Sequence, residues 1–163
     1  MPEMRSVLLF LLLSPLALLA QTPKSEGCQS CAVNKKMIRC DYYVARRGLK
    51  EKRSECESYA RYLDHDGTHA NAAWYYLLAG RPEEALTAAR KAMEAGQAYA
   101  AEYAIFALRI LEKEPEAQKL LKRYADLIRT AGRFEQDRRI LTRLYPKIRA
   151  LKEPLFPQTP ALR

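Results

Sequence analysis

Residues 80–93 read Gly-Arg-Pro-Glu-Glu-Ala-Leu-Thr-Ala-Ala-Arg-Lys-Ala-Met, which is the pattern of a helix that follows a turn. Pro82 suits the first position of a helix, because the N–H group that proline lacks would have no partner there. Glu83 and Glu84 then offset the positive end of the helix dipole. Apolar residues recur at intervals of three and four, at Ala85, Leu86, Ala89, Ala92 and Met93. This spacing predicts an amphipathic helix with a face of mostly small residues.

Similar apolar stripes lie on both sides of this stretch. The breaks between them fall at Gly80, Gly96, Glu114 and Gly132, at intervals of 16, 18 and 18 residues. Alanine, leucine, glutamate, lysine and arginine dominate the chain of 163 residues, and this composition favours helix over sheet. We therefore expect an all-α fold without a sheet, in which residues 66–150 form antiparallel helical hairpins. Pro146 should split or kink the last helix near Tyr145.

The breaks recur about every 34 residues per helix pair, which is the period of tetratricopeptide repeats. Gly80 fits the turn between the two helices of such a repeat. Ala85 and Ala92 fit its small positions, and Tyr76 fits the aromatic position of the first helix. His69 stands where the family prefers tryptophan. The chain therefore resembles a degenerate tetratricopeptide-repeat protein over about 85 of its 143 mature residues.

The resemblance implies a short solenoid of stacked hairpins, whose first helices line a concave surface that can bind a peptide. The second unit, residues 98–131, is more degenerate, and Asp137 then stands where a small alanine is expected. The resemblance places six residues near the concave surface: Ala70, Trp74, Leu77, Ala101, Ala104 and Leu108. A plain helical bundle is the alternative, and it differs in whether successive hairpins stack in the same sense.

The first 20 residues have the order of a secretory signal peptide. Arg5 precedes an apolar run from Val7 to Leu19, and the small residue Ala20 follows. The run is shorter than the ~20 residues of a membrane-spanning helix, and Pro15 interrupts it. We expect residues 1–20 to be a signal peptide and the protein to be periplasmic or secreted; an uncleaved anchor is the alternative. No transmembrane helix is expected in the mature chain.

An even number of cysteines in an exported chain favours disulfide bonds. Cys40 and Cys56 each lie eight residues from Gly48, and both belong to apolar stripes. If Gly48 is the turn of an antiparallel hairpin over residues 33–64, both cysteines lie about 12 Å from that turn. They would then face each other across the hairpin. We therefore predict a Cys40–Cys56 disulfide.

The other two cysteines form a CxxC motif, Cys28-Gln29-Ser30-Cys31, with the spacing of thiol oxidoreductases. Redox chemistry needs the first cysteine at a helix N-terminus, usually beside a strand, and only a polar run precedes Cys28. We expect Cys28 and Cys31 to form a second disulfide in a flexible segment, residues 21–32. A periplasmic thiol–disulfide redox protein is the alternative function. A four-cysteine zinc site is disfavoured, because Cys40 and Cys56 are far apart in the sequence.

Other candidate sites are few. Asp64, His65, Asp66 and His69 could bind a metal, but this pattern also suits a turn in which Asp66 or Thr68 caps the next helix. The sequence contains no motif for hydrolysis or for phosphate binding. We expect no metal, no cofactor and no catalytic residues.

The chain carries a formal net charge of +9, and its basic residues are unevenly distributed. One cluster, between residues 35 and 53, contains Lys35, Lys36, Arg39, Arg46, Arg47, Lys50, Lys52 and Arg53. A second, between residues 133 and 152, contains Arg133, Arg138, Arg139, Arg143, Lys147, Arg149 and Lys152. Export makes nucleic acid an improbable partner. Anionic lipids, cell-surface polymers and acidic proteins remain, and a merely solvated helix surface is the alternative.

These observations together predict an exported, non-catalytic binding or scaffold module. Its expected partner is a protein or peptide in the cell envelope, with acidic character favoured by the basic clusters. A stable helical domain whose basic ends attach to an envelope component is a further alternative. The last residues, 151–163, hold three prolines and are expected to form an extended tail.

Overall fold

The structure is a computed structural model that describes residues 29–154 and residue 156. Its α-helices are α1 (Gln29–Arg39), α2 (Arg53–His65), α3 (His69–Ala79), α4 (Pro82–Glu94), α5 (Ala101–Ile110), α6 (Glu114–Ala131) and α7 (Phe134–Leu144). The described residues contain no strand, which confirms the predicted all-α fold. The predicted signal peptide and Cys28 lie outside the described residues, as does most of the predicted tail.

Three shorter helical segments lie between these helices and a fourth follows α7. They are the π-helical segment η1 (Cys40–Arg46) and the 3-10 segments η2 (Lys50–Lys52), η3 (Ala98–Ala100) and η4 (Arg149–Leu151). None of the described helices combines the length and the apolar character that crossing a membrane requires.

The helix ends agree with the glycine and proline positions in the sequence. Gly80 follows α3 with a φ of 81°, and Gly132 follows α6 with a φ of 68°, so both take the left-handed conformation that glycine adopts without steric cost. Pro82 is the first residue of α4. α7 ends at Leu144, two residues before Pro146, as predicted.

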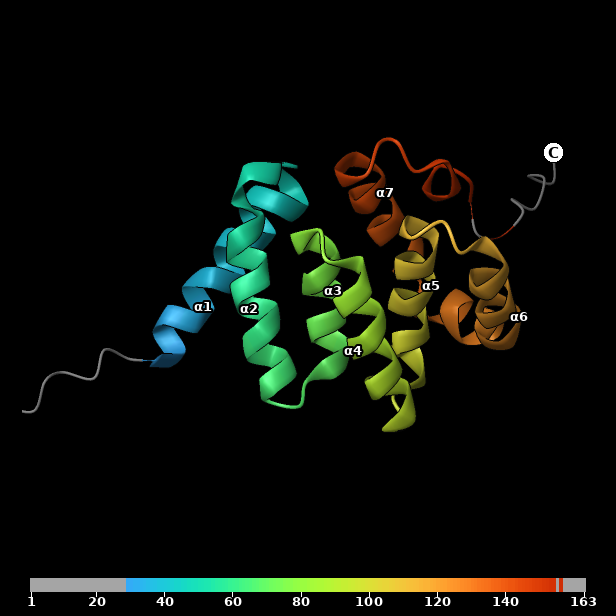
Figure 1. Ribbon diagram of the computed structural model, residues 1–163, viewed down its shortest axis with the longest axis horizontal. Coiled ribbons are helices and arrows are strands. Elements are labelled where there is room, and N and C mark those ends of the chain that lie inside the picture. Colours follow the sequence, from blue (N-terminus) through green and yellow to red (C-terminus); the bar gives the residue numbers. More distant parts are fainter. Residues whose placement is uncertain (1–28, 155, 157–163) are drawn as a thin grey trace, which may run out of the picture.

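Consecutive helices from α1 to α6 pack against one another and follow each other across the molecule (Figure 1). α3 contacts both α4 and α5. α7 does not extend this row beyond α6, because it turns back and contacts α3 as well as α6. In Figure 1 it lies at the top of the molecule, on the same side as η1. This return brings the C-terminal half of α7 next to η1.

The main core is built from small and aromatic residues of α3 to α7. Phe106 of α5 is the largest fully buried side chain among the described residues, and its ring stacks on Phe134 of α7 with the centroids 4.2 Å apart. Ala73, Ala85 and Ala104 belong to the same core and have no exposed surface. Small residues at these positions let neighbouring helices approach closely, so the core depends on alanine as much as on large side chains.

Replacing Ala85 by leucine should therefore overpack the contact of α4 with its neighbours. We expect the free energy of unfolding to fall by roughly 1–3 kcal/mol, measured by urea denaturation. Ala131→Leu, at the exposed end of α6, is the matched control and should change stability by less than about 0.5 kcal/mol. Equal effects of the two substitutions would contradict the close packing of α4.

The predicted disulfide is confirmed. Cys40 and Cys56 are bonded, with their Cα atoms 4.9 Å apart, and the bond joins η1 to α2. Gly48, with a φ of 70°, lies in the turn between the two arms. Both cysteines are fully buried in a small second core together with Val44, Leu78 and Leu144. The bond therefore links the N-terminal hairpin to residues that also contact α3 and α7.

The N-terminal hairpin differs from the sequence prediction in two respects. α1 begins at Gln29, so residues 29–32 are helical rather than part of a flexible segment. The first arm is not one regular helix, because its second half, Cys40–Arg46, is π-helical. A periodicity of 3.6 residues predicts which side chains are buried, but it does not reveal a local change of helix type.

Candidate functional site: a basic groove between η1 and α7

Arg46 of the first basic cluster lies close to three arginines of the second cluster, Arg138, Arg139 and Arg143. A groove open to solvent, with a volume of about 930 Å³, lies between η1 and α7. Its lining residues are Ala45, Arg46, Glu135, Gln136, Arg138, Arg139, Ile140, Thr142 and Arg143. Four arginines and one glutamate give this lining a formal charge of +3. We call this feature the η1–α7 groove.

Arg143 joins the two walls of the groove directly. Its guanidinium donates hydrogen bonds to the backbone carbonyl oxygens of Ala45 (2.9 Å) and Arg46 (3.3 Å), which lie almost one hundred residues earlier in the chain. Carbonyl oxygens carry no formal charge, so these bonds position the guanidinium without neutralising it. Arg143 therefore keeps its positive charge available to a ligand.

The C-terminal end of α7 is held in place by two further residues. Arg53 donates to the carbonyl oxygen of Leu144 (3.2 Å) and lies 5.0 Å from the centroid of the Tyr145 ring. The hydroxyl of Tyr145 donates to the carbonyl oxygen of Leu77 in α3 (2.6 Å). The wall of the groove that α7 forms is therefore tied to α2 and α3 as well as to η1.

The arginines of α7 differ in how far they are neutralised. Arg138 is largely buried and pairs with Glu135, at 2.8 Å between Nε and Oε2, and it also donates to the carbonyl oxygen of Leu151 (2.7 Å). The hydrogen bonds from Arg138 hold the pKa of Glu135 below its ordinary value. Arg139 lies 3.6 Å from the same carboxylate, but its side chain is 76% exposed. Arg138 is thus mainly structural, whereas Arg139 faces solvent.

The groove is not purely polar. Ile140 lines it between the arginines of α7, and Ala45 lines the opposite wall. Ile140 is half-buried and packs against the second core beside Leu144. A ligand of the groove could therefore bury an apolar side chain as well as pair its negative charges.

The residues that the repeat resemblance placed on a concave surface are mostly inaccessible. Ala70, Leu77, Ala101 and Ala104 have no exposed surface, and Leu108 is 1% exposed. These five side chains pack between helices and cannot contact a partner in this structure. The helices that carry these residues pack against both the preceding and the following helix, so their apolar residues are buried on more than one side.

Trp74, the sixth residue of that set, is half-buried. Its ring lies 6.0 Å from that of Tyr103, and it packs against both cores. The accessible candidate site is therefore the η1–α7 groove rather than the surface expected from the resemblance.

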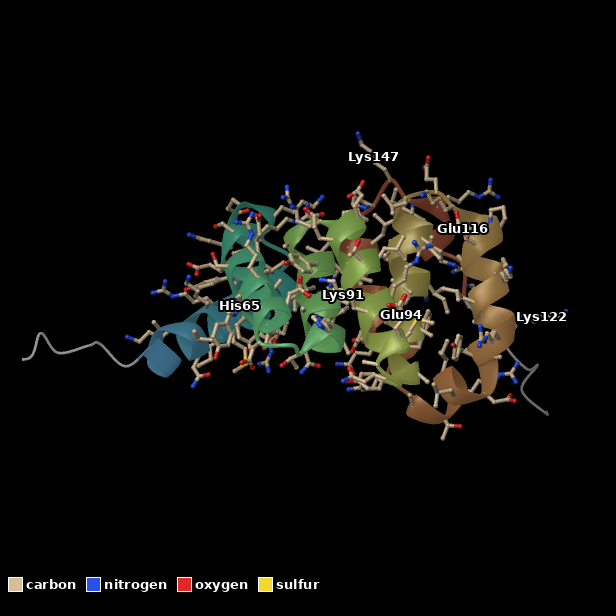
Figure 2. The ribbon with its side chains drawn as sticks, turned by 60° about the horizontal axis from the view of Figure 1, so that its bottom comes forward. His65, Lys91, Glu94, Glu116, Lys122 and Lys147 are labelled. Carbon is tan, nitrogen blue, oxygen red and sulfur yellow. A yellow bond between two sulfur atoms is a disulfide. The ribbon has the colours of Figure 1, made fainter. Side chains whose placement is uncertain are left out.

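The histidine-containing turn between α2 and α3 has a structural role. His69 Nδ1 lies 2.6 Å from Asp64 Oδ1, and Lys91 Nζ of α4 lies 3.5 Å from the same oxygen. Figure 2 labels His65 and Lys91 on this part of the surface, and Lys147 beyond the end of α7. Thr68 is the N-cap of α3, without a side-chain cap bond. The described residues contain no group of three or more potential metal ligands.

The CxxC motif is only partly described. Cys28 lies outside the described residues, and Cys31 belongs to the first turn of α1. Comparisons of the chain with protein-family models, with curated proteins and with solved structures give no match. The candidate site therefore rests on the geometry of the η1–α7 groove.

The sequence predicts the basic residues on both walls of this groove, but it does not predict that the two walls lie side by side. The clusters at 35–53 and 133–152 are visible as runs of basic residues. Nothing in a periodic pattern indicates that α7 returns to η1. The sequence does give one local indication of which arginines of α7 face solvent. Leu141 and Leu144 are buried, so arginines on the opposite face of the helix point outward.

Proposed function

We propose that this protein is an exported, non-catalytic binding or scaffold module that holds an acidic segment of a protein partner in the η1–α7 groove. The observation that carries the proposal is the convergence of Arg46, Arg139 and Arg143 on one groove from two distant parts of the chain. Concentrating like charges in one place is unfavourable unless counter-charges are near, so such a groove attracts an anionic ligand.

The shape and chemistry of the groove favour a polypeptide over the other anionic partners. It is an open groove lined by η1 and α7, and an extended chain can enter such a space more fully than a lipid surface can. Ile140 offers an apolar contact between charged positions, which a segment with both acidic and apolar residues would match. Sulfated or carboxylated polymers supply charge but little apolar surface.

Two other observations support the wider proposal. The contacts of α3 with both α4 and α5 are those expected when the first helices of successive hairpins stack, as in a tetratricopeptide-like scaffold. The Cys40–Cys56 bond suits a protein that works in an oxidising compartment, in line with the expected signal peptide.

The test is the affinity of a fluorescently labelled, glutamate-rich peptide that contains one leucine, measured by fluorescence anisotropy. The wild-type protein should bind this peptide more tightly than the same peptide with glutamine in place of glutamate. Arg139→Glu should weaken binding about tenfold or more, because it replaces an attractive charge with a repulsive one at the groove. Added salt should weaken binding further.

Arg90→Glu is the matched control. Arg90 lies on α4 outside the groove, is 56% exposed, and like Arg139 has a glutamate near it, at 3.4 Å. Arg90→Glu changes the net charge by the same amount as Arg139→Glu, so a general electrostatic effect would weaken peptide binding equally in both variants. Equal losses, or equal binding of the glutamate and glutamine peptides, would refute the proposed groove function.

A further inference from the structure

A buried glutamate of α5, Glu102, lies beside a half-buried aspartate of α7, Asp137, where the two helices meet. Glu102 of α5 is only 2% exposed, and its Oε1 atom has no hydrogen-bond partner. Its side chain lies within hydrogen-bonding reach of the carboxyl group of Asp137 in α7. Two carboxyl groups can form a hydrogen bond only when one of them carries a proton. A hydrogen bond between Glu102 and Asp137 would therefore need a proton on one of the two carboxyl groups.

Asp137 occupies a place in α7 that a hydrophobic residue would ordinarily take. Phe134, Leu141 and Leu144 are the buried residues of α7, and Asp137 falls on the same stripe, at helical spacing between Phe134 and Leu141. One turn of α5 beyond Glu102, Phe106 stacks on Phe134. The carboxyl pair and the two rings thus form the contact between α5 and the first half of α7.

The charges around the pair do not neutralise it. Arg133, at the start of α7, is the cation that acts on both carboxyl groups, and neither group forms an ion pair within the described part of the chain. Tyr103 of α5, with Tyr99 of the adjoining η3, is the other titratable neighbour. Among described residues, α3, α4 and α6 contribute no charge that acts on the pair. A doubly ionised pair would therefore be two adjacent anions, neither of which forms an ion pair with Arg133 or with any other described residue.

We propose that Glu102 and Asp137 form a proton-dependent latch, in which a shared proton holds the first half of α7 against α5 and loss of that proton releases it. The second half of α7 has separate anchors in Arg53, Arg143 and Tyr145. Release would therefore pivot α7 rather than detach it. Because α7 forms one wall of the η1–α7 groove, the latch would also set the affinity for the acidic partner, and this second part rests on the proposed function.

The direction of the pH dependence follows from the environment of the pair. Burial and the nearby charge of Asp137 raise the pKa of Glu102 to about 7. Burial raises the pKa of Asp137 to about 6. Both values lie above those of the unfolded chain, so the folded protein retains protons that the unfolded chain releases. The stability that the latch supplies is thus complete below about pH 4 and is lost as the pH rises through about 7.

The test is hydrogen exchange of the backbone amides of residues 137–140 in the full-length protein at pH 5.5 and pH 8, corrected for the intrinsic exchange rates. The protection of these amides in the wild-type protein should fall about tenfold or more at pH 8. Glu102→Gln should abolish this fall, because the amide donates a hydrogen bond to Asp137 at both pH values. Asp137→Asn is the second variant and should behave in the same way.

Glu94→Gln makes the same chemical change at an exposed position of α4 and should respond like the wild-type protein (Figure 2). An identical pH response in the wild-type, Glu102→Gln and Asp137→Asn proteins would overturn the latch, as would greater protection at pH 8. The wild-type protein should bind the glutamate-rich peptide more weakly at pH 8 than at pH 5.5. The Glu102→Gln variant should bind it equally at both pH values. A latch response without peptide binding at either pH would refute the proposed groove function and leave the latch standing.

Discussion

Replacing both Cys40 and Cys56 by alanine should lower the free energy of unfolding by about 3 kcal/mol. The bond closes a loop with a sequence separation of 16 residues, and the chain-entropy model gives about this value for a loop of that size. The two short arms bury little apolar surface against each other, so the disulfide should contribute much of what holds η1 against α2. Urea denaturation followed by far-UV circular dichroism measures the effect.

The matched control is the double alanine variant at Cys28 and Cys31. The disulfide predicted between these two cysteines would enclose a much shorter loop, so their replacement should have a far smaller effect on stability. Titration with a mild reductant should separate the two pairs, because the buried Cys40–Cys56 bond resists reduction longer. Equal losses of stability in the two double variants would contradict the structural importance of the Cys40–Cys56 bond. The bond also fixes η1, which forms one wall of the groove. Loss of the bond should therefore weaken binding of the glutamate-rich peptide.

Phe106→Ala should have the largest effect of any single substitution considered, a loss of about 3–5 kcal/mol in the free energy of unfolding. Phe106 is fully buried and stacks on Phe134, so its removal leaves a cavity and breaks the aromatic contact between α5 and α7. Thermal or urea denaturation is the measurement. Exchange of the α7 amides should also accelerate more than exchange of the α2 amides.

Phe106→Leu is the control, because it keeps much of the apolar volume while removing the ring. It should cost clearly less than Phe106→Ala. If Phe106→Ala cost less than about 1 kcal/mol, the contact between α5 and α7 would not be a part of the stable core. The latch formed by Glu102 and Asp137 would then lack the rigid neighbour on which its geometry depends.

The predictable part of this fold is local. Glycine and proline act through backbone conformation alone, so Gly80, Pro82 and Gly132 identified helix ends that the structure confirms. The Cys40–Cys56 bond was predictable for a similar reason. Equal distances from a turn place two residues opposite each other in any antiparallel hairpin, even though the first arm contains the π-helical segment.

The unpredictable part is tertiary. The position of α7 depends on contacts of Arg53, Arg143 and Tyr145 with backbone carbonyl groups, and such contacts leave no pattern in the sequence. Five of the six residues assigned to a concave surface are buried and Trp74 is half-buried. An apolar stripe in the sequence does not indicate how many neighbouring helices cover it. In the sequence Asp137 departs from the repeat pattern, but no pattern indicates that it lies beside Glu102.

The most direct test of the central claim is a titration of the isotope-labelled, full-length protein with the glutamate-rich peptide, followed by ¹H–¹⁵N NMR spectra. Binding in the η1–α7 groove predicts that shift changes concentrate at residues 45–46 and 135–143, and that Arg139→Glu removes them while Arg90→Glu leaves them in place. Shift changes confined to α3 and α4, or none at peptide concentrations that saturate other basic proteins, would contradict the assignment of the groove as the binding site.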